Sequence, residues 1–114
     1  MLIVRNLVVS IVFFLMTGSF ANATTDWQSQ ITVEKVQGLA DGGFIIYAPT
    51  GTDSNCPDNG RLFYLRNGQN GQTSDGIKTA LSIVLLAFTT SKTITFSYNG
   101  ASTSCYVSSV VINP

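Results

Sequence analysis

The chain lacks histidine and carries few charges. None of its 114 residues is histidine, and the four charged residue types make up only 11% of the total. Without an imidazole, the chain cannot form a Ser-His-Asp or Cys-His nucleophilic site. Such sparse charge also excludes a nucleic-acid partner, which requires a concentrated basic face, and no glycine-rich phosphate-binding motif is present. We therefore expect no enzymatic activity and a binding role instead.

Cysteine is also scarce, because Cys56 and Cys105 are the only two in the chain. Two thiols without histidine are too few for a zinc or haem site, so we expect no metal and no cofactor. Their wide spacing does not resemble a redox motif. An even pair in an exported protein predicts one disulfide. Closing so long a loop would stabilise the fold by roughly 4 kcal/mol.

The chain begins with an apolar run that is too short to span a membrane. Residues 7–16 are apolar except for Ser10, and Arg5 is the only charge before them. A membrane-spanning helix needs roughly 20 apolar residues. Small residues follow at Ala21 and Ala23, as a signal peptidase requires. We predict a cleavable signal peptide over residues 1–23, no membrane insertion after cleavage, and a secreted or periplasmic protein; the alternative is an uncleaved N-terminal anchor.

The remaining residues 24–114 form one predicted domain with almost balanced charge. Its basic residues are Lys35, Arg61, Arg66, Lys78 and Lys92, and its acidic residues are Asp26, Glu34, Asp41, Asp53, Asp58 and Asp75. Many aromatic and β-branched residues argue against disorder. Uncharged or polar surfaces, such as glycans or other proteins, are the expected partners.

Three strands are predicted in the first half of this domain. Residues 28–36 alternate apolar and polar side chains and change phase near Lys35, as a strand with a bulge does. Residues 44–48 form a short aromatic and β-branched run, and residues 61–66 form a third. Between the last two, residues 49–60 are rich in turn-forming residues and predict a loop.

One helix is predicted over residues 75–89, with Thr73 or Ser74 as its N-cap. The expected core-facing stripe consists of Ile77, Ala80, Leu81, Val84, Leu85 and Phe88. Ile83, Leu86 and Ala87 fall off this stripe, so the later turns are apolar nearly all round. Such a helix must be covered on more than one side, which indicates an oligomer contact at these three residues.

A hairpin of residues 93–98 and 105–112 is predicted to end the domain. Asn99-Gly100 favours a type I′ turn, with a longer loop through residues 101–104 as the alternative. The predicted disulfide would then join the loop before the third strand to the start of the last strand. The predicted class is mainly β with one helix (α+β), in the order β-β-β-α-β-β.

This order of elements, with its apolar helix at residues 75–89, resembles the OB-fold binding (B) subunits of AB5 bacterial toxins, including those of the subtilase-like and pertussis-like group. The resemblance implies an OB-like small β-barrel and a homo-oligomer, a pentamer, assembled through the helix. It also implies a binding module that recognises a cell-surface glycan or a partner protein. No sugar-binding residue of the family matches a position here, so none is transferred.

Candidate binding residues are therefore aromatic and hydroxyl side chains in or beside polar loops, since sugar rings stack on aromatic faces and loop groups bind their hydroxyls. They are Trp27, Tyr64, Tyr98, Ser102, Thr103, Ser104 and Tyr106. Each has a structural alternative: Trp27 would cover the open end of the barrel, the tyrosines would be half-buried strand residues, and the hydroxyls would belong to a solvated turn.

Two other functions remain open. Asp53 and Asp58 flank Cys56 and are a candidate carboxylate pair for a hydrolase, although aspartates in such a loop more commonly cap turns. The domain is otherwise a monomeric periplasmic inhibitor or envelope accessory protein, whose helix packs across its own sheet. The oligomeric state separates this alternative from the toxin-like one.

Overall fold

The computed structural model describes residues 25–114, so the predicted signal peptide lies outside the described residues. The elements in chain order are β1 (Asp26–Thr32), β2 (Lys35–Gly38), β3 (Phe44–Tyr47), α2 (Pro57–Gly60), β4 (Leu62–Leu65), α3 (Ser74–Thr90), β5 (Thr93–Tyr98) and β6 (Val107–Ile112). The prediction of a mainly β fold with one long helix is confirmed, and the short α2 is a tight turn within the predicted loop, since Asp58 and Asn59 have left-handed backbone angles.

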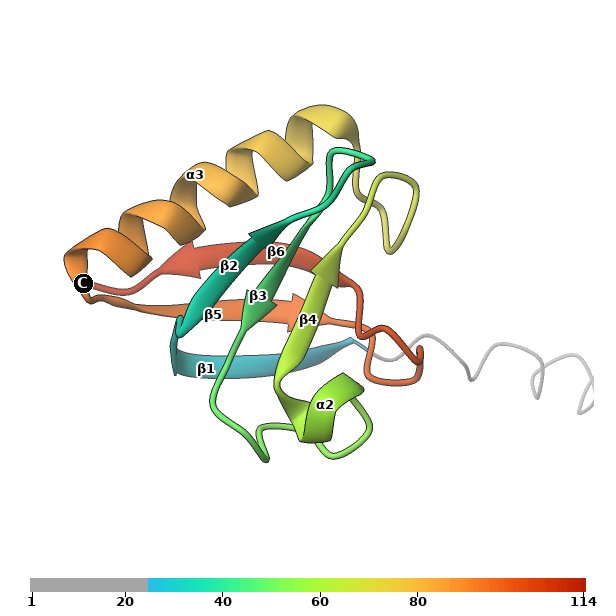
Figure 1. The fold of residues 1–114 in the computed structure, drawn as a ribbon, viewed down its shortest axis with the longest axis horizontal. Helices are drawn as coiled ribbons and strands as arrows, with labels where there is room; N and C mark the ends of the chain where they lie inside the picture. Colours follow the sequence, from blue (N-terminus) through green and yellow to red (C-terminus); the bar gives the residue numbers. More distant parts are fainter. Residues whose placement is uncertain (1–24) are drawn as a thin grey trace, which may run out of the picture.

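Two three-stranded antiparallel sheets make up the fold, in the orders β1-β5-β6 and β2-β3-β4. The two sheets cross face to face, and α3 runs along β6 beside them (Figure 1). The predicted first strand is in fact divided between the sheets: β1 belongs to one and β2 to the other, with Val33 and Glu34 between them. The predicted irregularity is present too, but it lies in β1 between Gln28 and Ile31.

The core lies between the sheets because each strand turns its apolar side chains toward the other sheet. Its largest completely buried side chains are Phe44, Ile46, Phe63, Leu65, Ile94 and Phe96. Phe63 packs edge-on against Phe96 and Tyr98, with ring centroids 4.8 and 5.0 Å apart. Edge-to-face pairs stabilise by roughly 1 kcal/mol beyond their area burial, so this aromatic cluster fixes how the sheets pack.

The sheets are joined along one side by β4 and the start of β6. Tyr64 and Tyr106 form an isolated parallel bridge, and the Tyr64 N–H donates to the Cys105 carbonyl at 3.3 Å. The predicted disulfide between Cys56 and Cys105 is confirmed and lies at the same side. On the opposite side the chain itself joins the sheets, as it passes directly from β1 into β2.

Helix α3 begins where its cap predicts. The Thr73 side chain accepts a hydrogen bond from the Gly76 N–H at 3.1 Å, as an N-cap threonine does. The helix ends at Ser91, whose backbone is left-handed and whose N–H donates to the Ala87 carbonyl. Within residues 25–114, no helix has both the length and the apolar composition that crossing a membrane requires.

The predicted core-facing stripe of α3 is only partly correct. Ile77, Ala80 and Val84 are buried as expected, whereas Leu85 and Phe88 are exposed. Ala87, which was expected off the stripe, is completely buried. Its small side chain lets the helix approach the sheets closely, so the line from Ile77 to Ala87 faces the core and larger residues lie to its sides.

The turn between β5 and β6 follows the longer alternative. Eight residues, 99–106, connect the strands, and the Asn99 N–H bonds to the Tyr106 carbonyl at 2.9 Å. Neither Asn99 nor Gly100 has the positive φ that a type I′ turn needs. A Cβ at position 100 would lie 2.5 Å from Asp26 Oδ2, so a larger residue would displace this carboxylate, which accepts the Gly100 N–H at 3.1 Å.

Candidate binding and assembly surfaces

Helix α3 exposes three large apolar side chains on both flanks of its core-facing line: Leu85 and Phe88, spaced at i and i+3, share one flank, and Leu86 lies on the other. Leu85, Leu86 and Phe88 are 42%, 52% and 45% exposed, and we call them the α3 patch. From Thr79 to Ser91 the helix contains no charged residue. A solvent-facing helix normally carries charged residues opposite its core face. This surface therefore has the composition of one that is covered.

The hydroxyl groups around the α3 patch are bonded within the helix. Ser82 donates to the Lys78 carbonyl at 3.1 Å, Thr89 to the Leu85 carbonyl at 2.9 Å, and Thr90 to the Leu86 carbonyl at 2.6 Å. Side chains bonded in this way need no water to satisfy their donors. The hydroxyls can thus be buried against another surface without losing a hydrogen bond.

The three predicted oligomer residues are not equally placed for that role. Leu86 is exposed and belongs to the α3 patch, whereas Ile83 is half-buried and Ala87 is completely buried. Ala87 as a contact residue is therefore wrong, since its side chain packs inside the subunit. Leu85 and Phe88 were missed because the sequence placed them on the core-facing stripe.

Among residues 25–114, Trp27 is the most exposed of the large apolar residues, at 57%. It lies on β1 in register with Ser97 of β5, and Ser97 pairs in turn with Ser109 of β6. The alternative prediction, that Trp27 covers the open end of the barrel, is therefore wrong. Its indole is exposed, whereas the neighbouring Ser97 is only 3% exposed and its hydroxyl is bonded to that of the exposed Ser109 at 2.7 Å.

Tyr98 is buried and cannot bind a ligand through its ring, so its selection as a binding residue is wrong. Only 2% of the residue is exposed. Its hydroxyl donates to Asp53 Oδ2 at 2.6 Å and accepts a bond from Gln28 Nε2 at 3.0 Å. Burial, and next the hydrogen bond to Asp53, raise the pKa of Tyr98 to about 12.

Tyr64, Tyr106 and the hydroxyl residues of the last loop come together where the sheets join. The strand bridge places Tyr64 beside Tyr106, and both are partly exposed. Asn70 Nδ2 donates to the Tyr106 carbonyl at 2.8 Å. Of the loop residues, Ser102 and Ser104 are half-buried, and Thr103 is exposed. Ser102 accepts the Tyr106 N–H at 3.4 Å, which fixes the loop against this tyrosine.

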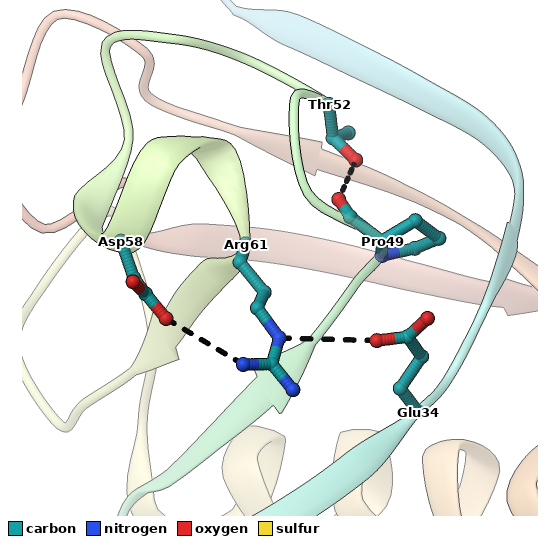
Figure 2. A network of polar contacts seen from close by, with 5 residues as sticks. All are labelled: Glu34, Pro49, Thr52, Asp58 and Arg61. Carbon is teal, nitrogen blue, oxygen red and sulfur yellow. Dashed lines mark hydrogen bonds and ion pairs between the residues drawn. The ribbon is translucent and has the colours of Figure 1, made fainter.

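The two carboxylates considered for hydrolysis each have a structural partner. Asp53 accepts the Tyr98 hydroxyl and also the Asn55 N–H at 3.0 Å, so it stabilises its own turn. Asp58 lies 3.6 Å from Arg61, which also lies 3.8 Å from Glu34 (Figure 2). Within residues 25–114, no cluster of three or more acidic, cysteine or histidine residues could hold a metal ion.

The loop before β4 is fixed by further short contacts. Figure 2 shows the Thr52 hydroxyl donating to the Pro49 carbonyl, at 2.6 Å. The Gly60 backbone passes so close to Asp53 that a Cβ would lie 2.3 Å from its carbonyl oxygen. Asp53 and Asp58 therefore belong to a tightly packed turn.

A groove of about 290 Å³ lies between α3 and β6, and no local sequence pattern predicts it. Its lining consists of Gln72, Gly76, Thr79, Ala80, Ile83, Ser108, Ser109 and Val110. All of these side chains are uncharged. The groove therefore suits a neutral ligand.

Sequence comparison finds no protein-family model and no curated protein that matches the chain. The function must therefore be inferred from the surfaces of the domain itself.

Proposed function

We propose that this domain is a secreted or periplasmic, non-enzymatic binding module of OB type, which assembles into a homo-oligomer through α3 and recognises a cell-surface glycan or a partner protein. In this it would act as the B subunits of AB5 toxins do, with a pentamer as the expected assembly. The α3 patch is the observation that carries the proposal.

The arrangement of the strands supports an OB-type barrel. The order β2-β3-β4 continues through the Tyr64–Tyr106 bridge into β6-β5-β1. The chain passes from β1 directly into β2 of the other sheet, so the two sheets are connected at both sides, although they do not form a closed barrel. A five-stranded, partly open barrel with one long strand shared by both sheets has this pattern.

The energetics of the α3 patch favour association. Completely burying a leucine or phenylalanine side chain stabilises by roughly 1.5–3 kcal/mol, and about half of each residue of the α3 patch is exposed. Covering the three residues would therefore contribute roughly 3 kcal/mol per copy. Since their hydroxyl neighbours are already bonded within the helix, little desolvation opposes this gain.

Two exposed surfaces suit ligand recognition. Trp27 and the exposed Ser109 on the same sheet form one, and Tyr64, Tyr106 and Thr103 form the other. Both combine an aromatic face with hydroxyl groups, as shallow glycan sites do. A glycan array with the wild type and Trp27→Ala would determine which surface binds, because only a ligand stacked on the indole is lost in this variant.

The test of assembly is light scattering on the exported protein, with Leu86→Asp as the disrupting variant. We expect the wild type to be oligomeric and Leu86→Asp to be a folded monomer, because the new carboxylate would be buried without a partner. Val111→Asp is the matched control, since Val111 on β6 is also 52% exposed and apolar. It should stay assembled. A monomeric wild type, or an assembled Leu86→Asp protein, would contradict the proposal.

One observation favours the monomeric alternative, an inhibitor or envelope accessory protein. The inner line of α3 is completely covered by the sheets of its own subunit, so the helix needs no second copy in order to fold. Light scattering decides between the two functions, because the accessory protein would remain monomeric at every concentration.

A further inference from the structure

We propose that the groove between α3 and β6 binds an extended, uncharged peptide segment of another protein, which adds to the edge of β6 as a further strand. This site does not include the α3 patch. It goes beyond the proposed function and holds whether or not the protein assembles.

The outer edge of β6 provides the hydrogen-bonding groups. Within residues 25–114, β6 is paired in its sheet only with β5. The Asn113 N–H donates to the Thr93 carbonyl at 2.9 Å. Because alternate residues of an antiparallel strand bond to the same partner, Ile112 and Val110 direct their N–H and C=O groups to the opposite edge. These are the groups to which a further strand would bond.

Helix α3 forms the second wall of the groove. Gly76, Ala80 and Ile83 are spaced at i, i+4 and i+7, so they lie along one side of the helix and line the groove with Val110. The two small residues leave space between the helix and the strand edge. Ile83 adds an apolar contact at the far end, where a peptide side chain would pack.

Gln72 shows that this edge accepts an amide. Its side chain is 7% exposed, and its Nε2 donates to the Val107 carbonyl at 3.2 Å and to the Ser108 carbonyl at 2.6 Å. A carboxamide is chemically equivalent to a peptide unit. Gln72 therefore occupies the place where a neighbouring strand would begin, and the same edge continues at Val110, which lines the groove, and then at Ile112, which lies beyond its lining.

Gly76 leaves room for the Gln72 carboxamide at the strand edge. A Cβ at this position would lie 2.9 Å from Gln72 Oε1 and 3.2 Å from Thr73 Oγ1. Any larger residue would therefore displace the Gln72 carboxamide from the strand edge. The shape of the groove and the position of the Gln72 carboxamide thus depend on the same residue. Because the lining carries no charge, the groove favours a neutral peptide.

The test uses nuclear magnetic resonance on the isotope-labelled protein, with a library of uncharged peptides about seven residues long, blocked at both ends, as the probe. We expect a subset to shift the amide resonances of Val110 and Ile112 and to slow their hydrogen exchange. N-methylation of the peptide amides that face β6 should weaken binding at least about tenfold. N-methylation of the intervening amides should have little effect, because strand addition uses alternate amides.

Two variants give the matched protein test. Thr79→Arg places a long cation in the groove and should lower the affinity of the best peptide at least about tenfold. Thr89→Arg is the control, since both threonines are exposed and both donate to the carbonyl four residues earlier in α3. It should leave the affinity unchanged.

Three outcomes would overturn the proposal. The first is that no peptide shifts the amide resonances of Val110 and Ile112 at about 1 mM peptide. The second is that N-methylation weakens binding equally at the peptide amides that face β6 and at the intervening ones. The third is that, in protein without peptide, the amides of Val110 and Ile112 are protected from hydrogen exchange and lose this protection when the protein is diluted. The last would show that a second copy occupies the edge. Measuring peptide binding by the Leu86→Asp variant separates this test from the assembly test. The α3 patch lies outside the groove, so this variant should still bind the peptide.

Discussion

The buried hydroxyl of Tyr98 gives a quantitative prediction about stability at high pH. An unfolded tyrosine releases its proton near pH 10, whereas burial and the bond to Asp53 raise the pKa of Tyr98 to about 12. Between these two values the folded state binds more protons than the unfolded state. Stability therefore falls as the pH rises through this interval, and the contribution is complete only below pH 10.

The magnitude follows from the size of the shift. Two pKa units correspond to about 3 kcal/mol, which is the upper limit of this contribution because the hydrogen bonds of the Tyr98 hydroxyl are only partly buried. At neutral pH, Tyr98→Phe leaves the Asp53 carboxylate without its hydroxyl donor at 2.6 Å. A hydrogen bond to a charged group contributes roughly 1.5–3 kcal/mol, so the variant should be less stable by about that amount.

The assay is urea unfolding of the wild type and Tyr98→Phe at a series of pH values. We expect the difference in the free energy of unfolding to be constant below pH 10, to begin to fall near pH 10 and to have shrunk by up to about 2 kcal/mol at pH 12. Other groups that titrate in this range affect both proteins and cancel in the difference. A difference that stays constant over the whole range would refute the reasoning, because Tyr98 would then titrate as it does in the unfolded chain.

Two further predictions concern the loop that precedes β4. Replacing Cys56 and Cys105 together by alanine should lower the free energy of unfolding by roughly 4 kcal/mol, because the disulfide spans 49 residues; urea unfolding measures this, and a loss below about 1 kcal/mol would contradict it. Gly60→Ala should cost at least about 2 kcal/mol, since its φ is +77° and its Cβ would overlap the Asp53 backbone. Gly51→Ala is the control, with φ +81° and open space around it, and equal losses in the two variants would show that the overlap with Asp53 does not matter.

The sequence predicts where the helix and the strands lie better than it predicts which side of the helix faces the core. Alternation in residues 93–98, the threonine cap at Thr73 and the presence of only two cysteines each determine one feature, and the structure has all three. The later turns of α3 are apolar nearly all round, so periodicity cannot select the line that faces the core. Side-chain volume decides instead, and it favours Ala87 over Leu85.

The candidate site was harder to predict than the fold. Tyr98 shares a strand face with Ile94 and Phe96, which indicated that it would be buried, and its polar neighbours misleadingly suggested a binding role. Trp27 could not be placed, since a tryptophan near the start of a domain either covers the core or faces solvent. The groove depends on Gly76 and Gln72, and no local pattern shows that their elements meet.

The joint between β4 and β6 has a consequence for how the domain responds to reducing conditions. This seam consists of one isolated strand bridge and one disulfide, whereas each sheet is held internally by a full ladder of backbone bonds. Reduction therefore weakens the boundary between the sheets and leaves both ladders intact. A thiol reductant should first let solvent reach the aromatic cluster around Phe63, before either sheet loses its strands.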